Sequence, residues 1–201
     1  MSSNVAETAE LAEGAFVHES AYVDGNVKIG KNTKLWHFVH VLSGTTIGSD
    51  CSLGQNVMAG PDVVIGNGCK IQNNVALYKG VTLEDGVFCG PSMVFTNVTT
   101  PRSEVNRRDE YAETMVRKGS TIGANATIVC GHELGEYCFI AAGAVVTKNV
   151  TPHAVMAGVP AKRIGWASHA GEMLKPNADG ILECPRTSDL YEERDGQLHR
   201  L

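Results

Sequence analysis

One polar segment of the chain, residues 97–118, carries side chains that suit anion binding. Three arginines, Arg102, Arg107 and Arg108, lie close together in it. Planar guanidinium groups bind phosphate and carboxylate through paired hydrogen bonds. The segment therefore predicts a site for a phosphorylated or carboxylated ligand. The alternative is a solvated loop with ordinary surface charge.

A second group of polar side chains precedes this segment. Gln72, Asn74 and Tyr78 offer hydrogen-bond donors and acceptors to a polar ligand, and Glu84 could orient an amine or act as a weak base. The alternative for Gln72 and Asn74 is a stacked amide ladder without a catalytic role. The alternative for Glu84 is a solvated turn residue.

These side chains are embedded in a strict six-residue repeat, which residues 97–118 interrupt once. Apolar residues recur at every sixth position: Val17, Val23, Ile29, Leu35, Val41, Ile47, Leu53, Ala59, Ile65, Ile71, Leu77, Leu83, Cys89 and Phe95, then Ile122, Ile128, Leu134, Ile140 and Val146. A small or β-branched residue follows most of them four places later, and glycine often follows directly. Such faithful self-similarity predicts a repeat architecture.

A period of six predicts short strands separated by tight turns, in which glycine would supply positive φ angles. Three strands make one triangular coil of about eighteen residues, and coils stack about 4.8 Å apart. The expected fold is an all-β solenoid. A regular solenoid has flat faces, so the inserted segment would supply the wall of a pocket.

The composition excludes several classes of protein. The 201 residues carry a formal net charge of −5, which argues against broad nucleic-acid binding. No apolar run reaches 18 residues, and the first residues lack the pattern of a secretory signal, so we expect a cytoplasmic protein without a membrane span. The six cysteines are then expected as reduced thiols, mostly packed in the core.

The stretches "IGKNTKLWHFVHVLSGTTIGSDCSLG", "IGNGCKIQNNV" and "IGANATIVCGHELGEYCFIAAGAVVTKNVTPHAVMAGVPAKRIG" resemble the hexapeptide-repeat acyltransferases. The resemblance implies a left-handed parallel β-helix over residues 15–166 and a homotrimer with active sites between subunits. Residues 1–14 are expected to be mobile, and residues 97–118 to form a loop that closes the site. Residues 167–201 would form a small appendage, with a helical turn in "SHAGEML" and a hairpin turn at Asp195-Gly196.

A finer resemblance is to the UDP-2-acetamido-3-amino-2,3-dideoxy-D-glucuronate N-acetyltransferases. "LWHFVHV", "LGQNV", "KIQNNVALYKGVTLEDGVFCGPSMVFTNVTTPR" and "GWASHAGEML" carry it. It implies transfer of acetyl from acetyl-CoA to a UDP-linked amino sugar during the synthesis of bacterial surface polysaccharide such as the lipopolysaccharide O-antigen. Gln72, Asn74 and Tyr78 would then contact the nucleotide or sugar, and the loop arginines its carboxylate or pyrophosphate.

Sugar-hydroxyl acetyltransferases of this fold carry a general-base histidine before a proline in this region. Here Thr100 precedes Pro101, so the base is missing. An alcohol needs such a base, whereas an amine is partly neutral near pH 7 and can attack a thioester directly. The site must then supply placement and an oxyanion donor. Asn97, whose amide offers two N–H groups, is the candidate for that donor.

For coenzyme A, the resemblance points to the last coils. The small residues Ala141, Ala142 and Gly143 would let an extended pantetheine arm lie along exposed backbone. Lys162 and Arg163 would bind the phosphates, and the alternative is a basic turn.

His37, His40 and His132 allow other hypotheses. A carbonic anhydrase with this helix binds zinc through three histidines, but it needs a pair four residues apart on one coil, which this chain lacks. No metal site is therefore predicted. His132 fills a small-residue position of the repeat. We expect a hydrogen-bonded inward histidine, and the alternatives are a substrate contact and the base of an O-acetyltransferase. A zinc-dependent or a purely structural β-helix protein is a further alternative.

Overall fold

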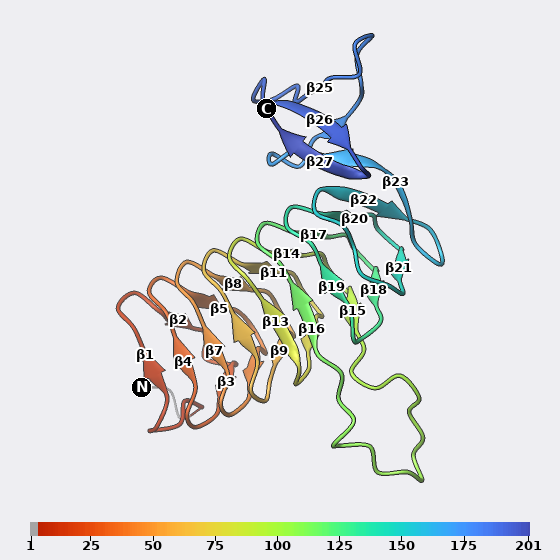
Figure 1. The fold of residues 1–201 in the computed structure, drawn as a ribbon. Helices are drawn as coiled ribbons and strands as arrows, with labels where there is room; N and C mark the ends of the chain where they lie inside the picture. Colours follow the sequence, from red (N-terminus) through yellow and green to blue (C-terminus); the bar gives the residue numbers. More distant parts are fainter. Residues whose placement is uncertain (1–3) are drawn as a thin grey trace.

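The computed structural model describes residues 4–201, and its main body is a parallel β-helix with three faces (Figure 1). The first sheet contains β1 (Glu10–Leu11), β4 (Lys28–Ile29), β7 (Thr46–Ile47), β10 (Val64–Ile65), β13 (Val81–Leu83), β16 (Thr114–Val116) and β19 (Glu133–Leu134). The second contains β2 (Phe16–Val17), β5 (Lys34–Leu35), β8 (Ser52–Leu53), β11 (Lys70–Ile71), β14 (Phe88–Cys89), β17 (Thr121–Ile122), β20 (Phe139–Ile140), β22 (Ala154–Ala157), β23 (Lys162–Ala167) and β24 (Met173–Leu174). The third contains β3 (Tyr22–Val23), β6 (His40–Val41), β9 (Met58–Ala59), β12 (Ala76–Leu77), β15 (Val94–Phe95), β18 (Thr127–Ile128) and β21 (Val145–Val146).

The six-residue repeat produces this shape because each repeat contributes one strand and one corner. Within the regular coils, each strand pairs in register with the strand eighteen residues away, as in Leu35 opposite Leu53, so identical repeat positions stack along the helix axis. The large apolar positions form one continuous buried core with the small positions beside them. The insertion adds residues to one coil without breaking this register, because Val81 lies opposite Thr114.

The corners correct our expectation for glycine. Positive φ occurs at the third corner residue, which is usually Asn, Asp or Gly, as in Asn74 (62°) and Gly68 (66°). The first corner residue is often glycine for another reason, which is close stacking of backbone on backbone. A Cβ atom added to Gly30 would lie 2.4 Å from the carbonyl carbon of Gly48 in the next coil. Gly60 is the exception, with a φ of 121° at the first position.

Two predicted boundaries were wrong. The insertion ends at residue 113, not 118, because β16 already pairs with β13 and β19. The β-helix also begins before residue 15, since β1 pairs with β4 and Val5 forms a bridge with Val23. Residues 4–14 therefore belong to the first coils, and residues 1–3 of the predicted mobile segment lie outside the described residues.

The C-terminal part ends the β-helix with antiparallel strands. β23 pairs with β22 and β24, so the segment predicted as a helical turn contains a strand instead. A small sheet follows, made of β25 (Leu182–Glu183), β26 (Leu190–Arg194) and β27 (Gln197–Arg200). The predicted hairpin turn is confirmed, since Asp195 and Gly196 connect β26 to β27 with positive φ angles.

Two further findings concern membrane spans and thiols. Between residues 4 and 201 the structure has no helix that is long and apolar enough to cross a membrane. All six cysteines are free and buried, which confirms their packing in the interior.

Candidate active site

The corners of the β-helix form three columns parallel to its axis. The first corner joins the first sheet to the second and includes residues 66–68, 84–86 and 117–119. The second corner joins the second sheet to the third and includes residues 36–38, 54–56, 72–74 and 141–143. The third corner joins the third sheet to the first and includes residues 78–80, the insertion 96–113 and residues 129–131.

Asn97 lies on the third corner, at the start of the insertion. Its carbonyl accepts a hydrogen bond from Ala112 N (3.0 Å), which closes the neck of the loop. Its half-buried side-chain amide makes no hydrogen bond within residues 4–201. Tyr78 lies on the same corner one coil earlier, with 36% of its surface exposed. An unpaired amide at a loop neck can donate to a ligand oxygen.

His132 lies beside the same corner one coil later. It is half-buried, and the register places it opposite Thr114. The imidazole makes no hydrogen bond within residues 4–201, so the expected hydrogen-bonded inward histidine was wrong. The buried Thr114 Oγ1 likewise has no partner in that range.

The insertion itself surrounds a cavity of about 730 Å³ that opens toward Asn97. Figure 1 shows the loop projecting from the β-helix between β15 and β16. Arg102 and Arg108 line this cavity and form no ion pair within residues 4–201. Arg107 lines it too, but its guanidinium binds Glu110 at 2.7 Å, and its buried Nε has no partner in the described chain. Two arginines thus remain available to an anion.

Gln72, Asn74 and the residues predicted to contact the pantetheine arm lie on the second corner. Asn74 Oδ1 accepts a hydrogen bond from Asn56 Nδ2 (3.0 Å), so it belongs to an exposed amide ladder. Gln72 is half-buried, and its side chain makes no hydrogen bond within residues 4–201. Ala141, Ala142 and Gly143 continue the same column, with Ala142 and Gly143 exposed.

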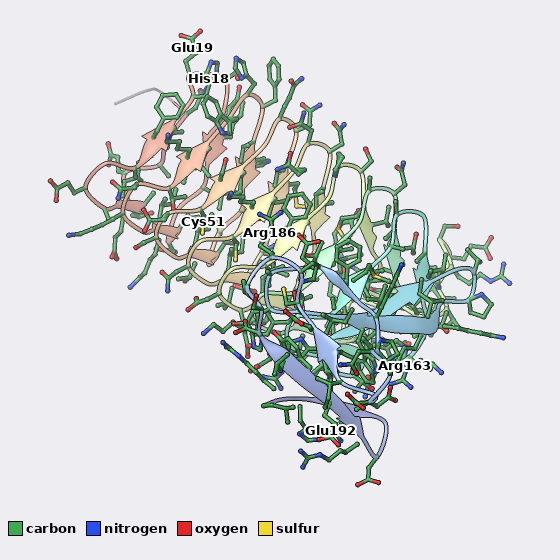
Figure 2. The ribbon with its side chains drawn as sticks, turned by 90° about the horizontal axis from the view of Figure 1, so that it is seen from above. His18, Glu19, Cys51, Arg163, Arg186 and Glu192 are labelled. Carbon is green, nitrogen blue, oxygen red and sulfur yellow. The ribbon has the colours of Figure 1, made fainter. Side chains whose placement is uncertain are left out.

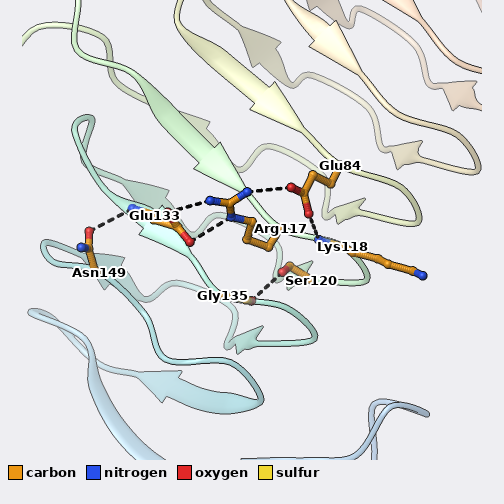
Figure 3. Close-up of polar contacts among 7 residues, drawn as sticks. All are labelled: Glu84, Arg117, Lys118, Ser120, Glu133, Gly135 and Asn149. Carbon is orange, nitrogen blue, oxygen red and sulfur yellow. Dashed lines mark hydrogen bonds and ion pairs between the residues drawn. The ribbon is translucent and has the colours of Figure 1, made fainter.

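Glu84 lies on the first corner, whereas Asn97 lies on the third, and Figure 3 shows the polar contacts of Glu84. Its carboxylate binds Arg117 Nη1 (2.8 Å) and accepts a hydrogen bond from Lys118 N (2.9 Å). Arg117 also binds both carboxylate oxygens of Glu133, at 2.9 and 3.1 Å. The hydrogen bonds to Glu133 and Glu84 raise the pKa of Arg117 above its ordinary value, and the bond from Arg117 lowers the pKa of Glu133. This network joins the coils before and after the insertion.

The two basic residues predicted for phosphate binding have different surroundings on β23. Arg163 lies over the ring of Trp166 at 4.1 Å and binds Glu193 at 3.0 Å. Its charge therefore holds the C-terminal sheet against the β-helix. Lys162 is exposed and forms no ion pair within residues 4–201.

One chain thus brings together part of the predicted site. The third corner collects Asn97, Tyr78 and the loop arginines, and the second corner collects Gln72, Asn74 and residues 141–143, whereas Lys162 and Arg163 lie apart on β23. In the part of the chain described, no three metal-ligating side chains converge, and His37 and His132 lie on different corners. Our sequence reading missed the exposed aromatic residues at the second corner. The sequence did hold a signal for these residues, because Phe38 occupies a turn position that is normally held by Asn, Asp or Gly.

Comparison with protein families identifies the repeats. Residues 26–61 and 44–79 match the family described as bacterial transferase hexapeptide (six repeats). Residues 118–148 match the hexapeptide repeat of succinyl-transferase. The matches therefore lie on both sides of the insertion.

Curated relatives match part of the chain. A dTDP-3-amino-3,6-dideoxy-alpha-D-galactopyranose 3-N-acetyltransferase of Aneurinibacillus thermoaerophilus is 37% identical over 46% of this chain and 47% of its own length. A 2,3,4,5-tetrahydropyridine-2,6-dicarboxylate N-acetyltransferase of Staphylococcus aureus is 36% identical over 44% of this chain and 34% of its own length. These matches span about half and about a third of the two relatives.

Solved structures show the same fold. The UDP-N-acetylglucosamine acyltransferase from Campylobacter jejuni matches with a TM-score of 0.57 and 18% identity, covering 81% of this chain and 74% of that chain. A hexapeptide transferase family protein from Anaplasma phagocytophilum matches with a TM-score of 0.50 and 19% identity, covering 81% of each chain. The chain therefore contains hexapeptide repeats on both sides of the insertion, and it has the left-handed β-helix fold of the solved hexapeptide acyltransferases.

Proposed function

We propose that the protein transfers acetyl from acetyl-CoA to the amino group of a nucleotide-linked amino sugar. The acceptor of choice is the 3-amino group of a UDP-2-acetamido-3-amino uronic acid, used for surface polysaccharide. The observation that best supports this proposal is the side-chain amide of Asn97, which has no hydrogen-bond partner within residues 4–201. It lies at the neck of an arginine-lined loop, in which Thr100 replaces the general base. The relative that acts on a dTDP-linked 3-amino sugar supports the acceptor class.

The reaction then needs no dedicated base. The neutral amine attacks the thioester carbonyl, a C–N bond forms, and the carbonyl electrons move to oxygen. Asn97 donates a hydrogen bond to that oxyanion. The C–S bond breaks as the carbonyl re-forms, and the thiolate of coenzyme A takes the surplus amine proton. Arg102 and Arg108 hold the sugar carboxylate or the pyrophosphate.

The complete site needs a second copy of the chain. The loop with Asn97 and the column with Gln72 and Ala141 occupy different corners, separated by the six-residue width of one face. At about 3.3 Å per residue, that separation reaches roughly 15–20 Å. A homotrimer would place the third corner of one subunit against the second corner of its neighbour. The residues of the two corners would then form one active site.

Substitution of Asn97 tests the proposal. Asn97→Ala should lower turnover by about 10²-fold, the smaller effect expected for loss of one oxyanion donor. Asn97→Asp keeps the shape, removes both N–H donors and should lose at least as much. Thiol release from acetyl-CoA measures the rate, with a UDP-linked 3-amino uronic acid as acceptor. A loss below threefold in both variants, with unchanged thermal unfolding, would exclude the oxyanion role.

A second candidate function is O-acetyl transfer with His132 as the base. The unpaired, half-buried imidazole beside the corner of Asn97 favours it. The 3-hydroxy analogue of the same UDP-sugar separates the two functions. Thiol release with the amine alone, retained in His132→Gln, supports N-acetylation. Release with the alcohol that disappears in His132→Gln establishes O-acetylation instead.

A further inference from the structure

Exposed aromatic side chains gather at and beside the second corner at the N-terminal end of the β-helix. Phe16 on β2 and Trp36 and Phe38 on the corner are 42%, 38% and 59% exposed. The Phe16 and Trp36 ring centres lie 5.6 Å apart, and the His18 and His37 ring centres lie 3.7 Å apart. Figure 2 shows His18 pointing outward at this end of the molecule. With only 6% aromatic residues in the chain, this clustering is a distinct feature of one corner.

Phe38 is an unusual residue type for its turn position, where the backbone has positive φ. Phe38 has a φ of 58°, whereas the equivalent residues of the next coils are Asn56, Asn74 and Ser92. Bulky side chains rarely adopt positive φ. An exposed phenylalanine in that conformation gains no core packing in return. Such outliers gather at ligand sites, where the surrounding structure holds them.

A cavity of about 320 Å³ lies directly beside the rings. Trp36 forms one wall, and its indole N–H donates to Ser52 Oγ (3.1 Å), which fixes the ring orientation. Gln55 and Gln72 form another part of the lining. Neither amide makes a hydrogen bond within residues 4–201, so both are available to a bound group. A fixed ring beside free amides suits a flat ligand with a polar edge.

The position of this cavity fits the proposed reaction. Along the second corner, the column runs from Trp36 through Gln72 to Ala141. Along the helix axis, the coil of Trp36 lies three coil spacings, roughly 14 Å, from the coil that ends at Asn97, and the Asn97 that faces this corner would belong to a neighbouring subunit of the proposed homotrimer. A nucleotide-linked sugar can extend over that length, with its base at one end and its amine at the other.

We propose that the Trp36 ring and the amides of Gln55 and Gln72 form the binding site for the nucleobase of the acceptor. The base stacks on the indole and its polar edge meets the two amides, while the diphosphate runs toward the C-terminal coils. This inference rests on the proposed function for its ligand class. It makes its own prediction, because nucleotide binding can be measured without acetyl transfer.

Titration of UDP against the whole protein tests this site. Base stacking on an aromatic side chain is worth about 1–3 kcal/mol, so Trp36→Leu should weaken UDP binding by about 5- to 150-fold. Trp36→Phe keeps a stacking surface and should bind nearly as well as the unchanged protein. Tyr22→Leu is the matched control, since Tyr22 is exposed on β3 but does not line the cavity. Calorimetry measures UDP and coenzyme A binding for each variant.

The outcomes separate this inference from the proposed function. Weaker UDP binding in Trp36→Leu, with coenzyme A binding and elution volume unchanged, supports the nucleobase site even if no amine is acetylated. Equal UDP affinity in Trp36→Leu overturns it, even if acetyl transfer proceeds. Dissociation of the oligomer in that variant also overturns it and assigns the rings to a subunit interface. If Trp36→Leu does not fold, quenching of indole fluorescence by UDP that is absent in Trp36→Phe supports the site, and unchanged fluorescence contradicts it.

Discussion

Replacement of Gly30 by alanine should destabilise the β-helix more than replacement of Gly68. The two glycines occupy the first and third positions of the first corner and serve different physical purposes. Gly30 allows two coils to approach, because an added Cβ would meet the Gly48 carbonyl carbon at 2.4 Å and Ser49 N at 2.5 Å. Gly68 provides a positive φ of 66° and has open space around it.

The expected magnitudes follow from these distances. Ordinary contact begins at 3.4 Å, so an alanine at position 30 would have to move by about 1 Å against rigid backbone. Coil spacing cannot yield easily, since Lys28 N and Gly30 N already bond to the next coil at 3.0 and 2.8 Å. Overpacking of this kind costs about 2–3 kcal/mol. Gly68→Ala costs about 1 kcal/mol, because only the left-handed conformation is penalised.

Urea unfolding followed by far-ultraviolet circular dichroism measures both free energies. Gly68→Asn is the control, because asparagine occupies the equivalent position in other coils and tolerates positive φ. We expect Gly30→Ala to be least stable, Gly68→Ala to be intermediate and Gly68→Asn to equal the unchanged protein. If Gly30→Ala is no less stable than Gly68→Ala, stacking distance does not explain the first-position glycines.

Two further predictions concern charged groups outside the third corner. Glu84→Gln should lower the thermal unfolding midpoint, because the carboxylate binds Arg117 and Lys118 N, and acetyl transfer should stay within about threefold. A loss of tenfold or more with unchanged unfolding would instead make Glu84 a substrate contact. Burial lowers the pKa values of His153 and His169 from 6.5, so the unfolded chain binds their protons first as the pH falls. The stability that these two histidines contribute is complete above pH 6.5 and decreases below it. In His153→Asn, the thermal unfolding midpoint should therefore change less between pH 7.5 and pH 5.5 than in the unchanged protein.

The repeat made the fold predictable because each position has one structural task. Leu35 and Leu53 must be apolar, since each packs against its counterpart in the next coil, and the sequence pattern records that requirement directly. The corner conformations were harder to predict. Glycine at the first and at the third corner position looks alike in a sequence, although, with the exception of Gly60, the third position is the one that has positive φ.

The candidate site was predictable only in part, because its residues come from different corners. Sequence spacing places Asn97 near Tyr78, but it does not show that Arg107 binds Glu110 or that Arg163 binds Glu193. These ion pairs depend on side-chain directions that no repeat specifies. The predicted end of the insertion at residue 118 was wrong for a different reason. Thr114 and Val116 already resume the repeat, but they lie within a polar segment.

The antiparallel strands β23 and β24 have a consequence for assembly. A parallel β-helix exposes unpaired strand edges at its ends, and such edges invite another molecule to add and extend the stack into a fibre. Here β22 meets β23 in the opposite direction, and β23 meets β24 in the same way. The C-terminal sheet then packs over this end through Trp166, whose indole N–H donates to Glu193 Oε2 at 2.6 Å. The C-terminal segment therefore ends the repeat and covers the last parallel strand of the second sheet against the addition of another molecule.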